Sequence, residues 1–83
     1  MFVVYALYSK IHDKIYIGFT SDITERFKSH NELAIKGWTV KFRPWEIIYQ
    51  EYCSSKAEAM QREKQLKTAA GRNFIRSLIH AKV

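Results

Sequence analysis

The sequence predicts a small α+β domain, in which helices pack on a three-stranded, antiparallel-leaning sheet in the order β-β-α-β-α-α. Two observations support this fold class. Three short segments have the apolar, β-branched composition of strands, and three others begin with helix-capping residues and continue with apolar side chains at helical spacing. Because the chain has 83 residues, 47% of them hydrophobic, we expect residues 1–83 to form one domain that folds on its own.

The strand segments lie at residues 2–8, 15–19 and 46–52. The first is continuously apolar, which is typical of a strand covered on both faces. A polar link over residues 9–14 joins it to the second, so the two are expected to form a hairpin. The third has polar ends that suit the edge of a sheet.

A first helix is expected to begin at Asp22, which can cap the free amides, with Glu25 completing a capping box. Its buried side is marked by Ile23, Phe27 and Ala34.

Two further helices are expected after the third strand. Ser55 and Glu58 form a second capping box, and the helix that they begin is expected to stop at Gly71. Asn73 can cap a last helix, in which apolar residues recur at helical spacing: Phe74, Ile75, Leu78 and Ile79.

The segment between the first helix and the third strand has no periodic pattern, and Gly37 and Pro44 interrupt it. We expect an exposed, mobile loop. It interleaves cations with aromatic rings, a combination that follows a phosphate backbone and stacks on unpaired bases: Lys36, Trp38, Lys41, Phe42, Arg43 and Trp45. Trp45 could equally anchor the core, and at least one tryptophan is expected to be structural.

Charge, apolar runs and cysteine content indicate which partners and which cellular location to expect. The net charge of +6 favours nucleic acid as a partner, although solvated lysines alone can give such an excess. No apolar run is long enough to cross a membrane. Cys53 is the only cysteine, so it cannot form an intramolecular disulfide, which fits a reducing, cytoplasmic location. With the three histidines it makes no zinc pattern, and we expect it to serve as a small buried hydrophobe.

Glu63 is the most informative single residue. It interrupts a predicted buried stripe that also holds Ala59, Leu66 and Ala70. One interpretation is an ion pair with Lys67 at i+4 on a wet surface. The other is a metal ligand at a cleft, because binding a cation offsets the free-energy cost of removing water from a carboxylate.

Tyr5 and Tyr16 occupy the middle of the two hairpin strands. A two-residue or four-residue turn would place both phenols on one face of the sheet as direct or diagonal neighbours, whereas a three-residue turn would separate them. Arg26 emerges at the margin of the first helix, where it can grip a phosphate or pair with Asp22. His30, one turn later, can shuttle a proton or complement the helix dipole.

These residues together resemble the GIY-YIG nucleases, in particular small stand-alone bacterial members. Val3-Val4-Tyr5 and Tyr16-Ile17-Gly18 match the two motifs that name the family, Arg26 follows Tyr16 by ten positions, and Glu63 lies in a matching helix. The chain departs from the family in having Val3 for a glycine, and Phe19 for a lysine that repair-associated members carry.

The resemblance implies an endonuclease that hydrolyses phosphodiester bonds, in DNA rather than RNA, in repair or recombination. Glu63 would hold one Mg²⁺ or Mn²⁺, and Arg26 would stabilise charge on the phosphoryl oxygens. Tyr5 or Tyr16, assisted by the other or by His30, would deprotonate the attacking water.

Nucleic acid is expected to contact Gly18, where the chain turns tightly ahead of the first helix, and a set of basic residues: Lys36, Lys41, Arg43 and Arg72. Two alternatives stay open. One is a module that keeps the nuclease fold and binds nucleic acid without cutting it. The other is a subunit whose protein partner supplies the substrate and its specificity.

Overall fold

The computed structural model describes residues 1–34 and 36–81. Its elements follow the predicted order β-β-α-β-α-α, with two short additional helices before the third strand. They are β1 (Phe2–Ser9), β2 (Lys14–Thr20), α1 (Ile23–Lys28), the π-helix η1 (Ser29–Leu33), the 3₁₀-helix η2 (Trp38–Phe42), β3 (Glu46–Cys53), α2 (Lys56–Leu66) and α3 (Ala69–Ala81). Among these residues no helix is long and apolar enough to cross a bilayer.

The three strands form one antiparallel sheet in the order β2-β1-β3, so β3 is an edge strand as predicted. The hairpin register pairs Ser9 with Lys14, which leaves a four-residue turn over 10–13. Tyr5 therefore lies opposite Gly18, and Tyr16 lies opposite Leu7. This register makes the two tyrosines diagonal neighbours on one face of the sheet, one of the two arrangements that allow them to meet.

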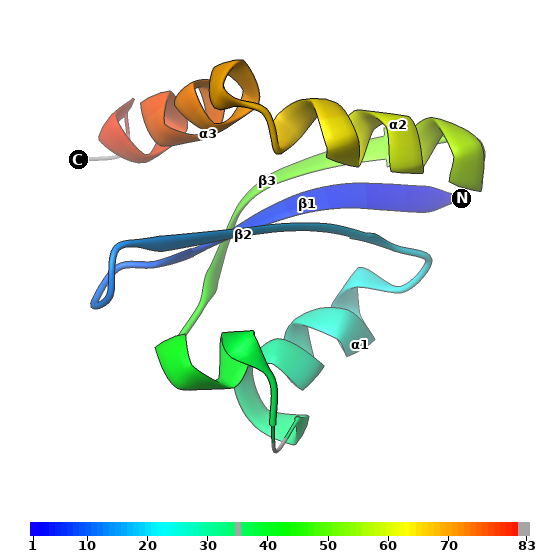
Figure 1. Cartoon of the computed structure of the whole chain (residues 1–83). Helices are drawn as coiled ribbons and strands as arrows, with labels where there is room; N and C mark the ends of the chain where they lie inside the picture. The colour runs from blue at the N-terminus through cyan, green and yellow to red at the C-terminus, as the bar shows by residue number, and fades with distance from the viewer. Residues whose placement is uncertain (35, 82–83) are drawn as a thin grey trace.

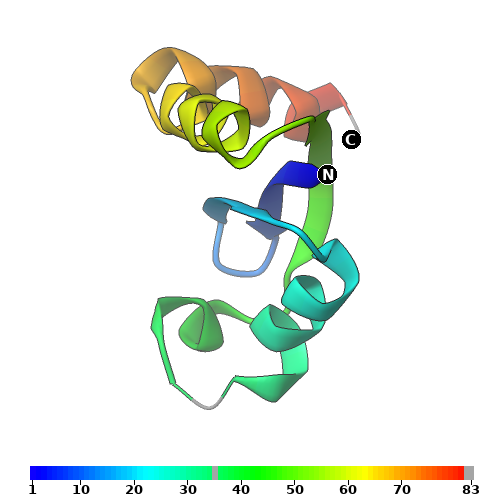
Figure 2. The same cartoon turned by 90° about the vertical axis from the view of Figure 1, so that its right-hand side faces the viewer.

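The sheet is the middle of three layers. Helices α2 and α3 lie over one face, and α1 and the segment that holds η2 lie on the other (Figures 1 and 2). Strand β1 alternates between the layers and is buried on both sides, as its apolar sequence predicted: Val4 and Ala6 belong to one core, and Tyr5 and Leu7 to the other.

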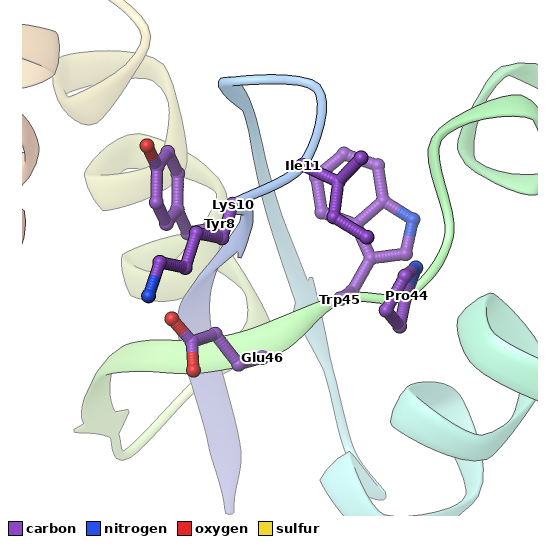
Figure 3. A pocket seen from close by; sticks show the side chains of 6 residues that line it. All are labelled: Tyr8, Lys10, Ile11, Pro44, Trp45 and Glu46. Carbon is purple, nitrogen blue, oxygen red and sulfur yellow. The ribbon is translucent and has the colours of Figure 1, made fainter.

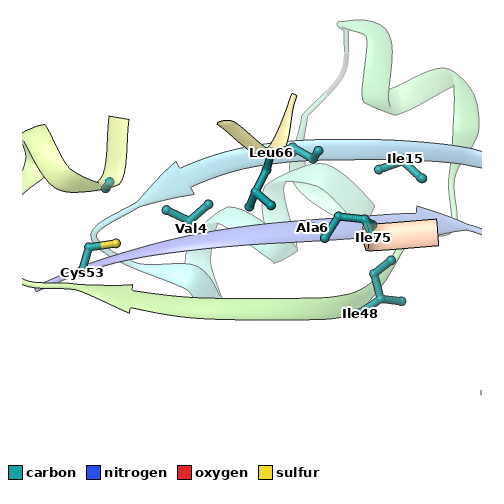
Figure 4. Close-up of a cluster of buried hydrophobic side chains, with 9 residues drawn as sticks. Val4, Ala6, Ile15, Ile48, Cys53, Leu66 and Ile75 are labelled. Atoms are coloured by element: carbon teal, nitrogen blue, oxygen red, sulfur yellow. The ribbon is translucent and has the colours of Figure 1, made fainter. Parts of the chain in front are cut away.

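We call the two cores the upper and the lower core. The upper core, under α2 and α3, consists of Val4, Ala6, Ile15, Ile17, Ile48, Cys53, Ala59, Leu66 and Ile75 (Figure 4). The lower core consists of Tyr5, Leu7 and Trp45, with Tyr16, Ile23, Phe27, Phe42 and Ile47 packed against it. Cys53 is thus a small buried hydrophobe, as expected, and burial raises the pKa of its thiol.

Helix α1 begins as predicted, but its capping box is incomplete. The Asp22 carboxylate accepts a hydrogen bond from the Glu25 backbone N–H at 3.1 Å. The Asp22 backbone N–H donates instead to the Thr20 hydroxyl at 3.1 Å. The Glu25 carboxylate therefore does not accept the hydrogen bond from Asp22 that would complete the box. Beyond Lys28 the chain widens into the π-helix η1, which ends at Leu33 and is capped by Ala34.

The boundary between the last two helices differs from the predicted one. Ser55 caps α2 as expected, with its hydroxyl accepting from the Glu58 N–H at 3.2 Å. However, α2 ends at Leu66, and α3 begins at Ala69, before Asn73. The cap of α3 is Thr68, whose hydroxyl accepts from the Gly71 N–H at 3.2 Å.

Gly71 explains this error. A Cβ on Gly71 would lie 2.4 Å from the Gln65 carbonyl oxygen and 2.4 Å from the Leu66 Cα, so the glycine allows the first turn of α3 to press against the end of α2. It marks a close approach of backbones and not a helix stop. Ala70 consequently lies exposed on α3, outside the predicted buried stripe.

The loop that was expected to be exposed is so only in part, because it contains η2 and two buried side chains, Thr39 and Trp45. Trp45 is 3% exposed, and its indole N–H donates to the Thr39 carbonyl at 2.8 Å. Trp45 is therefore the structural tryptophan, whereas Trp38 is 48% exposed. Pro44 and Trp45 line a small hollow of about 100 Å³ with Tyr8, Lys10 and Ile11 of the hairpin and Glu46 of β3 (Figure 3).

Candidate active site

Two phenols and an imidazole meet on the lower face of the sheet. The Tyr5 hydroxyl is 3.0 Å from His30 Nε2. The partly buried Tyr16 ring has its centroid 4.7 Å from that of His30 and 6.2 Å from that of Tyr5. We call these three residues the phenol–imidazole cluster. Strands β1 and β2 and helix η1 each supply one member, so the hairpin register and the π-helix together create it.

Gly18 makes room for this cluster. A Cβ at Gly18 would lie 2.9 Å from the Tyr5 hydroxyl oxygen and 3.1 Å from Tyr16 Cε2, so a side chain there would displace both rings. Gly18 is buried inside β2 and does not adopt positive φ. The predicted tight turn at this glycine is therefore wrong, and its role is to leave space.

His30 is held at both ring nitrogens. Its Nδ1 lies 3.1 Å from the Thr39 hydroxyl, opposite the contact with Tyr5, and the residue is 7% exposed. Burial lowers the pKa of His30, and the charges of Arg26 and Arg43 lower it further, so the imidazole is neutral near pH 7. Sequence analysis missed Thr39, since it lies in a segment without periodicity and nothing nearby marks it.

The two tyrosines have different environments. Burial raises the pKa of Tyr5 to about 12, although the neighbouring Arg26 guanidinium opposes this rise. Tyr5 is therefore a neutral phenol that holds His30. Tyr16 is only partly buried, which leaves it as the phenol that can face a substrate.

Arg26 lies at the edge of the cluster, exposed on α1. The Tyr5 phenol beside it raises the pKa of its guanidinium. In the described part of the chain Arg26 makes no ion pair with Asp22, which was the alternative interpretation. It instead lines an open hollow of about 300 Å³ with Thr20, Asp22, Glu25 and Ser29.

Glu63 is not in contact with the phenol–imidazole cluster. It lies on α2, which covers the opposite face of the sheet, and its side chain is 22% exposed between the buried Ala59 and Leu66. Its carboxylate is 3.5 Å from the Lys67 ammonium, the i,i+4 pair that the simpler interpretation predicted. Lys67 in turn lines a hollow at the open edge of β2 together with Tyr16.

The basic residues predicted to contact nucleic acid divide into two groups. Lys36, Lys41 and Arg72 are exposed. Arg43 is turned inward: its Nε donates to the His30 carbonyl at 2.6 Å, and its Nη2 donates to the carbonyls of Ser29 and Ala34 at 3.1 Å and 2.7 Å. Arg43 therefore caps the end of η1, and its guanidinium is not free to follow a phosphate backbone.

We expect Arg43→Ala to destabilise the protein by about 2–4 kcal/mol, because several carbonyls lose a charged donor in a partly buried position. Urea unfolding followed by circular dichroism measures this change. Lys41→Ala, two residues earlier and exposed, should stay within about 0.5 kcal/mol of the parent. Equal stability of the two variants would contradict the capping role.

A second expectation concerns pH. The pKa of His30 is lowered in the folded state from its ordinary 6.5. Below about pH 6.5 the unfolded chain therefore binds a proton at His30 more readily than the folded chain does. Stability should therefore be intact above about pH 6.5 and fall as the pH drops below it. Urea midpoints at about pH 7.5 and 5.5 should differ in the parent and differ less in His30→Gln. His12→Gln and His80→Gln, at exposed positions, are the matched control variants.

Comparison with known proteins identifies the family of this chain. A model of the GIY-YIG catalytic domain family matches residues 1–75. A UPF0213 protein of Staphylococcus haemolyticus (strain JCSC1435) is 39% identical over 56 residues, 68% of this chain and 68% of the relative. One from Staphylococcus aureus (strain Mu3 / ATCC 700698) is 35% identical over 54 residues, 65% of this chain and 66% of the relative. The alignments thus span about two thirds of these relatives. Because the family model covers nearly all of the sequence, the chain belongs to the GIY-YIG catalytic domain family, whose fold is that of nucleases.

Proposed function

We propose that the protein is a cytoplasmic, divalent-metal-dependent endonuclease that hydrolyses phosphodiester bonds in DNA, in repair or recombination. The observation that carries this proposal is the convergence of Tyr5, Tyr16, His30 and Arg26 on one face of the sheet, in a chain of a nuclease family. Charge points the same way, since the net charge is +6 and the exposed cations include Lys36, Lys41 and Arg72.

In this proposal each residue of the site has a distinct task. Arg26 is exposed and charged, so it can bind the phosphoryl oxygens and stabilise the charge that grows on them. Tyr16 orients the attacking water. His30 packs against that phenol, with both ring nitrogens held by the Tyr5 and Thr39 hydroxyls. Tyr5 stays protonated and fixes the His30 ring by the 3.0 Å contact.

Glu63 would hold one Mg²⁺ or Mn²⁺. Residues 1–34 and 36–81 contain no group of three or more His, Cys, Asp and Glu side chains that could hold a metal by themselves. A single carboxylate still fits magnesium, which is commonly held by one or two carboxylates, with waters and substrate phosphate completing its shell. The ion pair with Lys67 is partly exposed and contributes about 1 kcal/mol or less, so Glu63 can exchange that partner. When bound, the ion would supply positive charge at the phosphate and lower the pKa of a water.

The proposal is tested by incubating the purified protein with supercoiled plasmid DNA and Mg²⁺ or Mn²⁺. We expect nicked circles to accumulate, and EDTA to stop their formation. The Arg26→Ala variant, purified and assayed in the same way, measures the background from contaminating nuclease. If the protein nicks no faster than this preparation with either metal, the enzymatic proposal is wrong.

One observation favours a second candidate, a module that binds nucleic acid without cutting it. Glu63 lies in the layer opposite the phenol–imidazole cluster and is paired with Lys67. A binding module predicts gel shifts that Glu63→Ala leaves unchanged and Lys41→Ala weakens, with no cleavage of any substrate. Cleavage that depends on Glu63 would exclude it.

A further inference from the structure

An open hollow at the outer edge of β2 joins the two helical layers. Its volume is about 330 Å³, within the size range of small-ligand sites. Strand β2 and helix η2 supply one wall, and the end of α2 and the start of α3 supply the other. The lining residues are Ile15, Tyr16, Ile17, Trp38, Lys67 and Arg72.

Trp38 forms a rigid aromatic surface in this hollow. Its ring centroid lies 4.8 Å from that of Phe42, 5.8 Å from Trp45 and 6.5 Å from Tyr16. These neighbours fix the indole, yet Trp38 is 48% exposed. Because the ring is already ordered, a planar ligand that stacks on it loses little free energy to restricting the side chain.

Two cations face the same hollow. Lys67 is partly engaged by Glu63, and Arg72 is exposed and makes no ion pair among the described residues. An aromatic surface with a guanidinium across from it suits a ligand that has both a flat ring and an anion, and a nucleotide has both. Inside a duplex both faces of each base are covered by neighbouring bases, so the bases that can stack on the indole are unpaired ones.

We propose that this hollow binds an unpaired nucleotide of the substrate, with its base on Trp38 and its phosphate at Arg72. The inference rests on the proposed function for its choice of nucleic acid and adds the substrate class, namely strands with unpaired nucleotides beside the phenol–imidazole cluster. Tyr16 lines the hollow and belongs to that cluster, so the bound nucleotide would lie next to the reacting phosphate.

Tryptophan fluorescence tests this directly, in EDTA so that no cleavage is required. The chain has two tryptophans, of which Trp45 is buried. An oligothymidylate of about eight nucleotides, within the usual site size for one small domain, should quench the emission of the native protein. It should not change the emission of Trp38→Phe, where only Trp45 remains. A relaxed, covalently closed circular duplex, which has neither ends nor unpaired nucleotides, should quench neither protein at the same phosphate concentration.

Affinity measurements with a labelled oligothymidylate complete the test. Trp38→Ala should weaken binding about tenfold or more, the loss expected for one stacked base, while Trp38→Phe should retain most of the affinity. Arg72→Ala should weaken binding and reduce its salt dependence. A matching oligouridylate shows whether the base site accepts RNA as well.

Two results would overturn the inference: unchanged native emission at saturating oligothymidylate, or binding by Trp38→Ala within about twofold of Trp38→Phe in folded protein. Both are independent of catalysis. If the protein binds through Trp38 but never nicks DNA, the proposed enzymatic function is wrong and the nucleotide site stands. If it cuts duplex DNA and Trp38 has no role, the nucleotide site is wrong and the enzymatic function stands.

Discussion

Replacing Glu63 with glutamine should slow DNA cleavage by about a hundredfold or more, since an amide supplies no negative charge to hold the proposed cation. The fold should persist. Glu63 is partly exposed, and its one partner in the described structure is Lys67 on the surface of the same helix. Single-turnover cleavage with Mg²⁺ in excess measures the rate, and thermal unfolding by circular dichroism checks the fold.

Glu32→Gln is the matched control, because it makes the same chemical change at an exposed position outside the proposed site. It should cut at the parent's rate. Mn²⁺ binding, followed by the electron spin resonance of the free ion in the presence of an uncleavable oligonucleotide, should be lost in Glu63→Gln alone. Cleavage by Glu63→Gln at the control's rate would show that this carboxylate holds no catalytic ion.

Arg26→Ala should have an effect of similar size, about a hundredfold to a thousandfold on the cleavage rate, the usual loss for one donor to a charged transition state. Its stability should change little, because the side chain is exposed and lacks an ion pair among the described residues. Rates under single-turnover conditions separate this effect from weaker binding.

Arg26→Lys tests whether charge alone suffices. A lysine keeps the charge but cannot make two parallel hydrogen bonds to a phosphate, so we expect it to recover only part of the rate. Lys28→Ala, exposed on the same helix, removes an equal charge and should cut like the parent. A loss in Lys28→Ala as large as that in Arg26→Ala would point to general attraction of DNA and not to a specific contact.

The features that sequence predicted well are those set by local chemistry. The polar link between the first two strands allowed few turn lengths, and one of them gives the register that brings Tyr5 and Tyr16 together. Asp22 and Ser55 cap their helices because their side chains reach amides only three residues away. Alternating burial of β1 likewise follows from its unbroken apolar sequence.

The features that sequence missed depend on distant parts of the chain. Gly71 resembles a helix stop until the backbone of Leu66 is seen against it. Arg43 resembles a phosphate ligand because its carbonyl partners at Ser29 and His30 lie more than ten residues away. The helical pattern around Glu63 shows that the carboxylate interrupts an apolar stripe, but it does not say which face of the sheet that helix covers.

The burial of β1 on both sides has a mechanical consequence. The central strand belongs to two separate clusters of apolar side chains, one above the sheet and one below it. The lower side also contains the phenols, the imidazole and the exposed indole, whereas the upper side is packed by two longer helices. The strand that carries Tyr5 is therefore packed on its upper side by α2 and α3, so a substrate that contacts the lower layer meets a strand already fixed from the opposite face.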